Sequence, residues 1–392
     1  MADLVFPQPV DEFRRNTYGK TWALYEGDES RFHGVAGWET LNAILASVRF
    51  ETPRFRLARG GELIPVETYT ELIDRRGGPP YRRIVAGRLL EELRKGASLT
   101  VDRADHADDA VRRLTAALEA ELRAEVFANI FASWLPIPAF NVHWDDQDVF
   151  AVQLSGRKHW RIFGPTRQWP LVRDSAENQR PAGPPVAEFD VTAGDVLYLP
   201  HGWWHSVSAV GEPSLHLTIG VIPDSGIDFM RWLVDRATAN ELIRQRLPRF
   251  AGEDERRAYL AAVRDYWNQA LTSTDVLEQF FTYADGTSHS LPRFDLPDIL
   301  SSNTVLDRKK ARVLLLATRA TVDRTGDGFV LTGLGRRWSF PPVAKPVIDA
   351  VLSHDGVTVG EVVDSGAKSD VSEEQVAEIL FTLLRAGVIV LR

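Results

Sequence analysis

The sequence contains no cysteine in 392 residues. That absence excludes disulfides, thiolate nucleophiles, Cys-ligated zinc and protein-ligated iron–sulfur clusters. Any metal site must therefore be built from His, Asp and Glu. Long apolar runs are missing too: no stretch approaches the roughly 18 residues that a membrane helix needs, and the first residues lack the charged and then apolar segments of a secretion signal. We therefore expect a cytoplasmic protein with no membrane partner.

Lysine is scarce, with only seven residues, so that Arg supplies most of the positive charge. The net charge of -8 argues against a broadly basic surface, and we expect no nucleic-acid partner. With 44% apolar and 26% charged residues the composition is that of a packed globular protein. A chain of this length exceeds one hydrophobic core, which predicts two or three domains.

The first part of the chain predicts a catalytic domain over residues 1–225. Up to about residue 125 the pattern predicts a helix-rich region that surrounds a sheet. Its clearest helix has apolar residues at helical spacing, namely Val111, Leu114, Leu118 and Leu122. Residues of about 126–222 form short runs rich in Val, Ile, Phe and Trp, separated by turn signals. This pattern predicts a mainly β core, a double-stranded β-helix of the jelly-roll or cupin type.

The second part of the chain returns to helical periodicity. Residues 226–290 predict a helical linker or dimerisation domain, because apolar and aromatic residues recur three and four apart. Residues 291–392 predict a strand, two helices and a hairpin, in this order. The helices are expected in segments 345–364 and 372–392, and the second of these segments ends in a terminal strand. We interpret this order as a winged-helix-like domain.

Three residues of the β region predict a metal site. His143 and Asp145 are two apart on a predicted strand, so their side chains share one face. His205 follows a tight turn at residues 192–195 and a further strand. Two His and one carboxylate leave three coordination positions open, as in non-haem Fe(II) oxygenases. A zinc site with a bound water is the alternative. A single HxD pattern is weak, and the prediction depends on all three residues together.

A cation in the same β region predicts an anion-binding site. Lys158 shares a strand face with Trp160 and Ile162, where it can bind the distal carboxylate of 2-oxoglutarate. A rim lysine with a buried stem is the alternative. Asn129, among apolar neighbours, either donates a hydrogen bond to the proximal carboxylate or the substrate, or is structural. Three tryptophans flank the metal ligands, and we expect them to pack in the core: Trp144, Trp203 and Trp204.

The segments HWDDQDVFAVQLSGRKHWRIF, FDVTAGDVLYLPHGWWHSV and SLHLTIGV resemble the JmjC-type ribosomal oxygenases, also described as cupin-4 proteins. The resemblance implies that His143, Asp145 and His205 bind iron and that Lys158 binds 2-oxoglutarate. It also implies a dimerisation region and a winged helix. Gly220 departs from the pattern, because many relatives have a hydroxyl residue near the co-substrate at this position.

The resemblance implies an Fe(II)- and 2-oxoglutarate-dependent dioxygenase that uses O2 to hydroxylate an Arg or His side chain of a ribosomal protein. A non-ribosomal peptide or a free amino acid is an alternative substrate, and lysyl demethylation is an alternative outcome of the same iron chemistry. A non-enzymatic alternative is a sensor whose winged helix binds nucleic acid. The predicted second helix, SEEQVAEILFTLLR, disfavours this, because it begins acidic and is largely apolar. We expect a homodimer.

Overall fold

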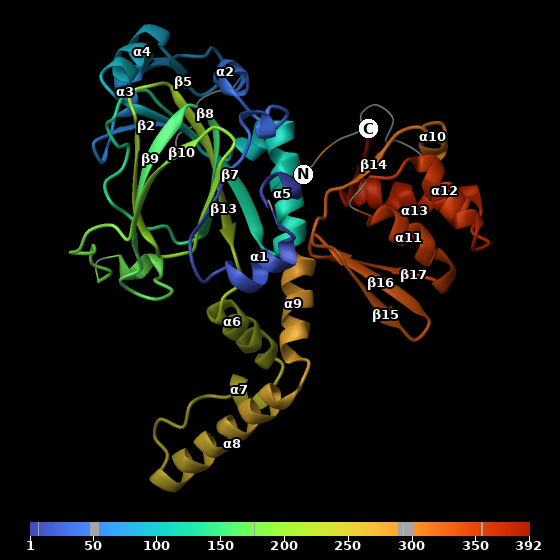
Figure 1. Ribbon diagram of the computed structural model, residues 1–392. Helices are drawn as coiled ribbons and strands as arrows, with labels where there is room; N and C mark the ends of the chain where they lie inside the picture. Colours follow the sequence, from blue (N-terminus) through green and yellow to red (C-terminus); the bar gives the residue numbers. More distant parts are fainter. Residues whose placement is uncertain (7, 48–54, 176, 289–292, 294–301, 354–355) are drawn as a thin grey trace. The chain divides into compact units, whose positions relative to one another are not determined.

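The computed structural model describes residues 1–6, 8–47, 55–175, 177–288, 293, 302–353 and 356–392 (Figure 1). The chain divides into two compact units, Met1–Pro223 and Asp224–Arg392. The predicted boundary near residue 225 falls beside this division, whereas the one at 290 and 291 lies outside the described residues. Within the described part of the chain, no helix combines the length and apolar character needed to cross a membrane.

The first unit is built on two β-sheets whose strands pair antiparallel, as the prediction of a jelly-roll core requires. The larger sheet has the order β1-β11-β8-β13-β7-β6-β2-β3, and the smaller sheet has the order β10-β9-β12. Their bounds are β1 Ala23–Tyr25, β2 Phe55–Arg59, β3 Glu62–Leu63, β6 Ser98–Val101, β7 Glu125–Ser133, β8 Asp148–Ser155, β9 Arg157–Gly164, β10 Ala187–Thr192, β11 Val196–Leu199, β12 Trp204–Ala209 and β13 Ser214–Ile222. A separate hairpin pairs β4 Thr70–Ile73 with β5 Tyr81–Ile84.

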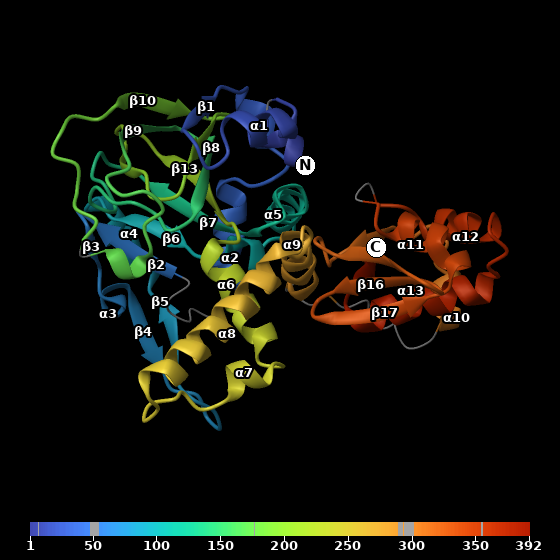
Figure 2. The same cartoon turned by 90° about the horizontal axis from the view of Figure 1, so that it is seen from below.

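Helices cover the outer face of the larger sheet, and α5 (Asp109–Leu122) lies along β7 in both views (Figures 1 and 2). The helix begins at Asp108, whose carboxylate accepts hydrogen bonds from two backbone N–H groups of the first turn. Val111, Leu114 and Leu118 are fully buried, which confirms the predicted helical stripe. Each contributes roughly 1.5–3 kcal/mol by leaving water. The other helices of this unit are α1 Val10–Asn16, α2 Trp38–Ser47, α3 Val66–Tyr69 and α4 Ala86–Arg94.

The inner faces of the two sheets enclose the space in which the site lies. On β9, Lys158, Trp160 and Ile162 are buried while His159 and Arg161 between them are not, which confirms the predicted strand parity. The register pairs Ile162 with His205 of β12, so His205 shares this inner face. Strand alternation therefore aims a cation and a histidine into one barrel.

The second unit begins with helices, as predicted for residues 226–290: α6 Gly226–Ala237, α7 Glu241–Arg244, α8 Glu253–Thr272 and α9 Val276–Thr287. Its remaining elements are α10 Ser302–Leu306, β14 Val313–Leu315, β15 Thr321–Thr325, β16 Gly328–Gly333, β17 Arg336–Phe340, α11 Lys345–Val351, α12 Val359–Ala367, α13 Glu373–Ala386 and β18 Ile389–Leu391. A second hydrophobic core joins α11, α12 and α13 with β14 and β18.

Two predictions for the last hundred residues are wrong in detail. The three-stranded sheet β15-β16-β17 precedes the helices, whereas a hairpin was expected after them. Segment 345–364 forms two helices instead of one. The physical reason for the second helix is a capping box at its start, where Thr358 and Glu361 satisfy each other's backbone N–H groups.

Candidate metal centre and adjoining cavity

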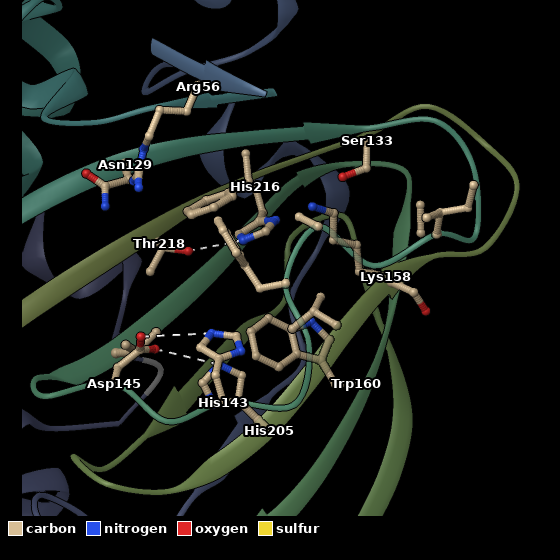
Figure 3. Close-up of a pocket in the computed structure, with 18 of the residues that line it drawn as sticks. Arg56, Asn129, Ser133, His143, Asp145, Lys158, Trp160, His205, His216 and Thr218 are labelled. Atoms are coloured by element: carbon tan, nitrogen blue, oxygen red, sulfur yellow. Dashed lines mark hydrogen bonds and ion pairs between the residues drawn. The ribbon is translucent and has the colours of Figure 1, made fainter. Parts of the chain in front are cut away.

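His143, Asp145 and His205 converge at one end of the barrel (Figure 3). One ligating atom from each lies within 4.8 Å of the others. The Nε2 atom of His143 is 3.9 Å from one carboxylate oxygen of Asp145, and the Nε2 atom of His205 is 3.6 Å from the other. Among the described residues, these three form the group of His, Asp and Glu side chains whose ligand atoms lie close enough together to hold one metal ion.

The segment that carries His143 and Asp145 is not a strand, which corrects the prediction. It lies in a loop before β8 and makes a single antiparallel bridge, in which the backbone N–H groups of His143 and His205 each donate to the other's carbonyl. Pro136 and Pro138 precede it and have no N–H to extend a ladder. The two ligands still face one way, because the bridge and a bond from the Gly202 N–H to the Asp145 carbonyl fix this loop.

Backbone carbonyls orient both imidazoles. The Nδ1 atom of His143 is 2.8 Å from the Asn141 carbonyl, and the Nδ1 atom of His205 is 3.0 Å from the Trp203 carbonyl. A carbonyl only accepts, so each Nδ1 carries the proton and each Nε2 keeps a lone pair aimed at the centre. Burial and the neighbouring His143 lower the pKa of His205 to about 4. His205 is therefore neutral near pH 7, the state that binds a metal.

A buried carboxylate holds the loop that carries His205. Asp148 accepts hydrogen bonds from the Tyr198 hydroxyl and the His201 N–H, both at 2.7 Å. Burial raises the pKa of Asp148, and these two hydrogen bonds act against that rise. Tyr198 in turn accepts from the Gly19 N–H. Asp148 is thus a structural residue that fixes the turn between β11 and β12.

The metal centre opens into a cavity of about 380 Å³ between the two sheets. Both Lys158 and Asn129 line it, together with the three candidate ligands. Its wall combines polar side chains with aromatic and aliphatic ones: Arg56, Phe131, Ser133, Ile137, Ala139, Phe140, Gln147, Val149, Trp160, Val207, Ser208, Ala209, His216 and Thr218.

Lys158 is the cation at the inner end of this cavity. It is 3% exposed, and its ammonium group makes no hydrogen bond or ion pair with any residue that the structure describes. Burial alone lowers its pKa to about 7. Two other buried groups of the wall also lack partners within the described chain, the Trp160 indole nitrogen and the His216 Nδ1. Unsatisfied buried polar atoms are rare in folded proteins, so this end fits an anionic ligand.

The Asn129 side chain makes one hydrogen bond within the described part of the chain and keeps its amide N–H groups as donors. Its side-chain oxygen accepts from the Arg103 N–H at 2.9 Å, so its amide nitrogen remains available to the cavity. Thr218 is its cross-strand neighbour on β13, and the Thr218 hydroxyl lies 3.1 Å from the His216 Nε2. His216 and Thr218 were not among the predicted site residues, although they share the strand parity of Gly220 in the SLHLTIGV segment. No local sequence pattern could have identified Arg56 as a cavity residue, because only the pairing of β2 with the sheet brings it to the barrel.

The expected core packing holds for Trp204, which is buried and whose indole donates to Thr166 at 2.7 Å. Trp203 is partly buried against a core cluster, whereas Trp144 is half-buried and belongs to no core cluster of the described residues. None of the three lies in the described cavity wall. Trp160 lies in the wall instead, with its ring stacked 5.6 Å from that of His205. Asp146 is exposed and does not belong to the group of candidate ligands.

Gly220 lies two residues after Thr218 on β13, and the Phe127 ring occupies the space that a side chain at position 220 would need. A Cβ atom at Gly220 would lie 2.4 Å from this ring. Replacing Gly220 by Ala is therefore expected to lower the free energy of unfolding by about 1–3 kcal/mol through overpacking, measured by urea denaturation. Gly34→Ala, where nothing lies within 4 Å, is the control. If Gly220→Ala is neutral, or if adding Phe127→Leu does not restore stability, the packing argument fails.

Residues 103–229, which hold most of the β barrel and the His-Asp-His centre, match the model of the JmjC domain. The chain is similar to ribosomal oxygenase 1 of Gallus gallus, with 29% identity over 60% of this chain and 38% of the relative. It is also similar to ribosomal oxygenase 2 of Bos taurus, with 38% identity over 27% of this chain and 25% of that relative.

Another relative is the bifunctional lysine-specific demethylase and histidyl-hydroxylase NO66 of Drosophila persimilis, 36% identical over 20% of this chain and 12% of the relative. The chain thus spans well under half of each of these relatives. Among solved structures, the ribosomal oxygenase YcfD of Escherichia coli in complex with cobalt and 2-oxoglutarate matches with a TM-score of 0.61 and 18% identity over 98% of both chains. That likeness supports the fold.

Proposed function

We propose that this chain is an Fe(II)- and 2-oxoglutarate-dependent oxygenase that hydroxylates an amino-acid side chain of a protein, with a ribosomal protein as the expected substrate. The observation that carries the proposal is a His-Asp-His centre that opens into a cavity with a buried lysine at its far end, and this lysine has no ion-pair partner among the residues that the structure describes. The similarity to ribosomal oxygenases supports the substrate class.

The donor set fits Fe(II). Two neutral imidazole nitrogens and one carboxylate, His143, His205 and Asp145, are the ligands that non-haem iron oxygenases use, and they leave positions for a bidentate co-substrate and O2. Lys158 fits the distal carboxylate of 2-oxoglutarate, because a charge-assisted bond would satisfy an ammonium group that burial otherwise penalises. When bound, iron would activate O2 as the oxidant; 2-oxoglutarate would be oxidised to succinate and CO2 and take up one oxygen atom, while the other would enter the substrate.

The protein's own residues position the reactants and exclude water. The carbonyls of Asn141 and Trp203 hold the ligand imidazoles in one tautomer. Strand β9 places Lys158 four residues from the point opposite His205, roughly 13 Å along the strand. This separation, less the length of a lysine side chain, leaves room for a short dicarboxylate between the cation and the centre.

The proposal is tested by anaerobic titration with Fe(II), followed by addition of 2-oxoglutarate and O2. We expect stoichiometric iron binding, formation of succinate, and the gain of one oxygen atom by a ribosomal protein in mass spectra. Zinc binding without any succinate formation would favour the zinc alternative and contradict the proposal. Release of formaldehyde in place of a stable mass gain would favour lysyl demethylation, and turnover of free amino acids alone would exclude a protein substrate.

We infer that the helices of residues 226–290 form a homodimer interface. The 20-residue helix α8 has no buried residue among those described, and Leu260 on it is 64% exposed. Phe250, in the preceding loop, is 96% exposed. Apart from Trp267, which packs against the Trp232, Leu233 and Phe280 cluster, α8 has little tertiary packing. A helix with so little packing is marginal in water, and exposed apolar side chains of this kind indicate a partner surface.

The dimer makes a direct prediction. Light scattering is expected to give twice the 43.9 kDa mass of the chain, and Leu260→Asp is expected to give the monomer, because a desolvated carboxylate opposes the contact. Leu90→Asp on α4, where Leu90 is 52% exposed in the first unit, should leave the mass unchanged. A monomeric native protein would contradict the inference.

We further propose that residues 291–392 have a winged-helix-like arrangement and that the protein acts in the cytoplasm. In support, α11, α12 and α13 share one core, and β18 pairs with β14 after the last helix. Val376, Leu380 and Leu383 of α13 are buried in that core, while its first turn presents Glu373 and Glu374. An acidic helix start disfavours contact with a nucleic-acid phosphate, and retention on DNA columns at low salt would contradict this part of the proposal.

A further inference from the structure

Three buried nitrogen groups without a partner in the described chain meet at the inner end of the cavity. Lys158 and Trp160 are two residues apart on the inner face of β9 and are 3% and 2% exposed. His216, 4% exposed, faces them from β13, and its ring lies 6.2 Å from that of Trp160 (Figure 3). The Lys158 ammonium, the Trp160 Nε1 and the His216 Nδ1 bond to no residue that the structure describes. Such a cluster of unsatisfied groups indicates a site for a small ligand.

The Lys158 nitrogen is a nucleophile at neutral pH. Burial lowers its pKa to about 7, so that near this pH about half of the molecules carry a neutral amine with a free lone pair. Asp145 is the one carboxylate of the described cavity wall and lies at the metal centre, away from Lys158 (Figure 3). The other titratable and charged side chains of that wall are cationic or neutral: Arg56, His143, His205 and His216. No anion of the described wall therefore keeps the Lys158 amine protonated.

We propose that Lys158 binds CO2 covalently and reversibly as a carbamate, and that this carbamate competes with 2-oxoglutarate for the cavity. The amine lone pair forms a bond to the carbon of CO2, one carbon–oxygen π bond opens to an oxygen anion, and the nitrogen gives a proton to water. The step needs no oxidant or reductant. This chemistry goes beyond the proposed function, in which Lys158 acts only as a cation, and it requires no turnover.

The groups beside Lys158 can bind the carbamate oxygens. The Trp160 indole N–H is a donor only. The Thr218 hydroxyl lies 3.1 Å from the His216 Nε2 and can donate to it, which leaves the ring proton on Nδ1. Two buried N–H groups at this end are thus available to an anion. A carbamate would remove the free-energy cost of leaving them without an acceptor.

The charges of the cavity favour the carbamate when a divalent ion is bound without the co-substrate. Asp102 compensates Arg56 at 2.7 Å, and the two positive charges of the ion exceed the single negative charge of Asp145. A carbamate on Lys158 would cancel this excess, whereas an ammonium group would add to it. 2-Oxoglutarate brings two carboxylates of its own and requires the ammonium form. CO2, a product of the proposed reaction, would therefore hold the enzyme in a form that excludes its co-substrate.

The first test is ¹³C NMR under ¹³CO2, with protein whose lysines carry ¹⁵N at Nζ. Zn(II) serves as a diamagnetic ion for the centre, and the metal-free protein is measured beside it. We expect a carbamate line that is split by coupling to ¹⁵N, because the new bond joins the two labelled atoms. 2-Oxoglutarate, at a concentration that calorimetry shows to be saturating, should abolish this line. Bicarbonate held only as a counter-ion would give no splitting and would overturn the proposal.

Lys158→Met should lack the split line, and it is expected to fold, because an apolar chain of similar length replaces a buried ammonium group. Lys368→Met removes an exposed lysine of the second unit and should keep the line. A split line that survives in Lys158→Met, or its absence from both the metal-free and the Zn(II)-loaded native protein, overturns the proposal. A line that persists in saturating 2-oxoglutarate contradicts the competition. These outcomes do not depend on turnover, so they leave the proposed function standing.

Steady-state kinetics give a second readout. With the Fe(II)-loaded chain, the KM for 2-oxoglutarate is expected to rise in proportion to dissolved CO2 at fixed pH and ionic strength, with kcat unchanged. The CO2 concentration that half-fills Lys158 in the NMR titration should raise KM about twofold.

Lys158→Arg is the matched variant for the kinetic test, because it keeps a cation and has no amine that can form a carbamate. Its KM, whatever its value without CO2, should not respond to CO2. An equal response in this variant would place the effect of CO2 elsewhere and overturn the proposal. Absence of succinate from the native protein at every CO2 concentration is instead a failure of the proposed function, and the NMR result then decides on the carbamate alone.

Discussion

Asp145→Ala is expected to reduce 2-oxoglutarate turnover by more than about 100-fold, since even the loss of an outer partner of a metal ligand costs 10–100-fold. Asp145 supplies the only carboxylate of the centre, and its two oxygens lie 3.9 Å and 3.6 Å from the two imidazole Nε2 atoms. Without it, two neutral nitrogens face a divalent cation with no compensating charge. Iron affinity, measured by anaerobic titration, and succinate formation should fall together.

The neighbouring Asp146→Ala is the matched control, because it removes an exposed carboxylate one residue away. It should retain iron binding and turnover. Asp145→Ala should remain folded, with a free energy of unfolding within about 1 kcal/mol of the native value, because the side chain is partly exposed and supports no core packing. Unchanged succinate formation in Asp145→Ala would eliminate the proposed centre.

Lys158→Met is expected to have opposite effects on binding and on stability. Loss of the cation should weaken 2-oxoglutarate binding by about 100-fold or more, because a buried carboxylate without its partner costs roughly 3–5 kcal/mol. The ligand-free protein should become more stable by about 1–4 kcal/mol, because an apolar chain of similar length replaces a buried ammonium group that has no partner among the described residues. Calorimetric titration and urea denaturation measure the two effects separately.

The stability difference between native protein and Lys158→Met should depend on pH. Lys158 has a pKa of about 7 in the folded chain, against 10.5 when unperturbed. Between these values the unfolded chain binds a proton that the folded chain has released, so the native protein gains stability as the pH rises from about 7 to 10. Lys158→Met should lack this gain, and the two proteins should therefore approach equal stability at high pH.

Lys368→Met serves as the control for loss of one lysine, because Lys368 is exposed on the second unit. It should alter neither 2-oxoglutarate affinity nor the pH dependence of unfolding. If Lys158→Met binds 2-oxoglutarate as tightly as the native protein, Lys158 is a rim residue with a buried stem, and the distal carboxylate must be bound elsewhere.

Local sequence patterns determined much of this protein. The absence of Cys restricted the metal ligands to His, Asp and Glu, and strand alternation assigned Lys158 and Trp160 to one buried face. Helical spacing likewise identified α5 with its buried leucines. These features follow from residues close together in the chain, because side-chain direction repeats with a fixed period along a strand or helix. The same periodicity gave a wrong prediction for His143 and Asp145, which were expected on a strand and lie in a loop.

Only the tertiary structure decided what meets inside the barrel. Arg56 reaches the cavity because β2 joins the sheet through β6, which no local pattern records. The space of a side chain at Gly220 is filled by Phe127 from a strand far away in the sequence. Such contacts depend on strand order and register, which bring distant residues together.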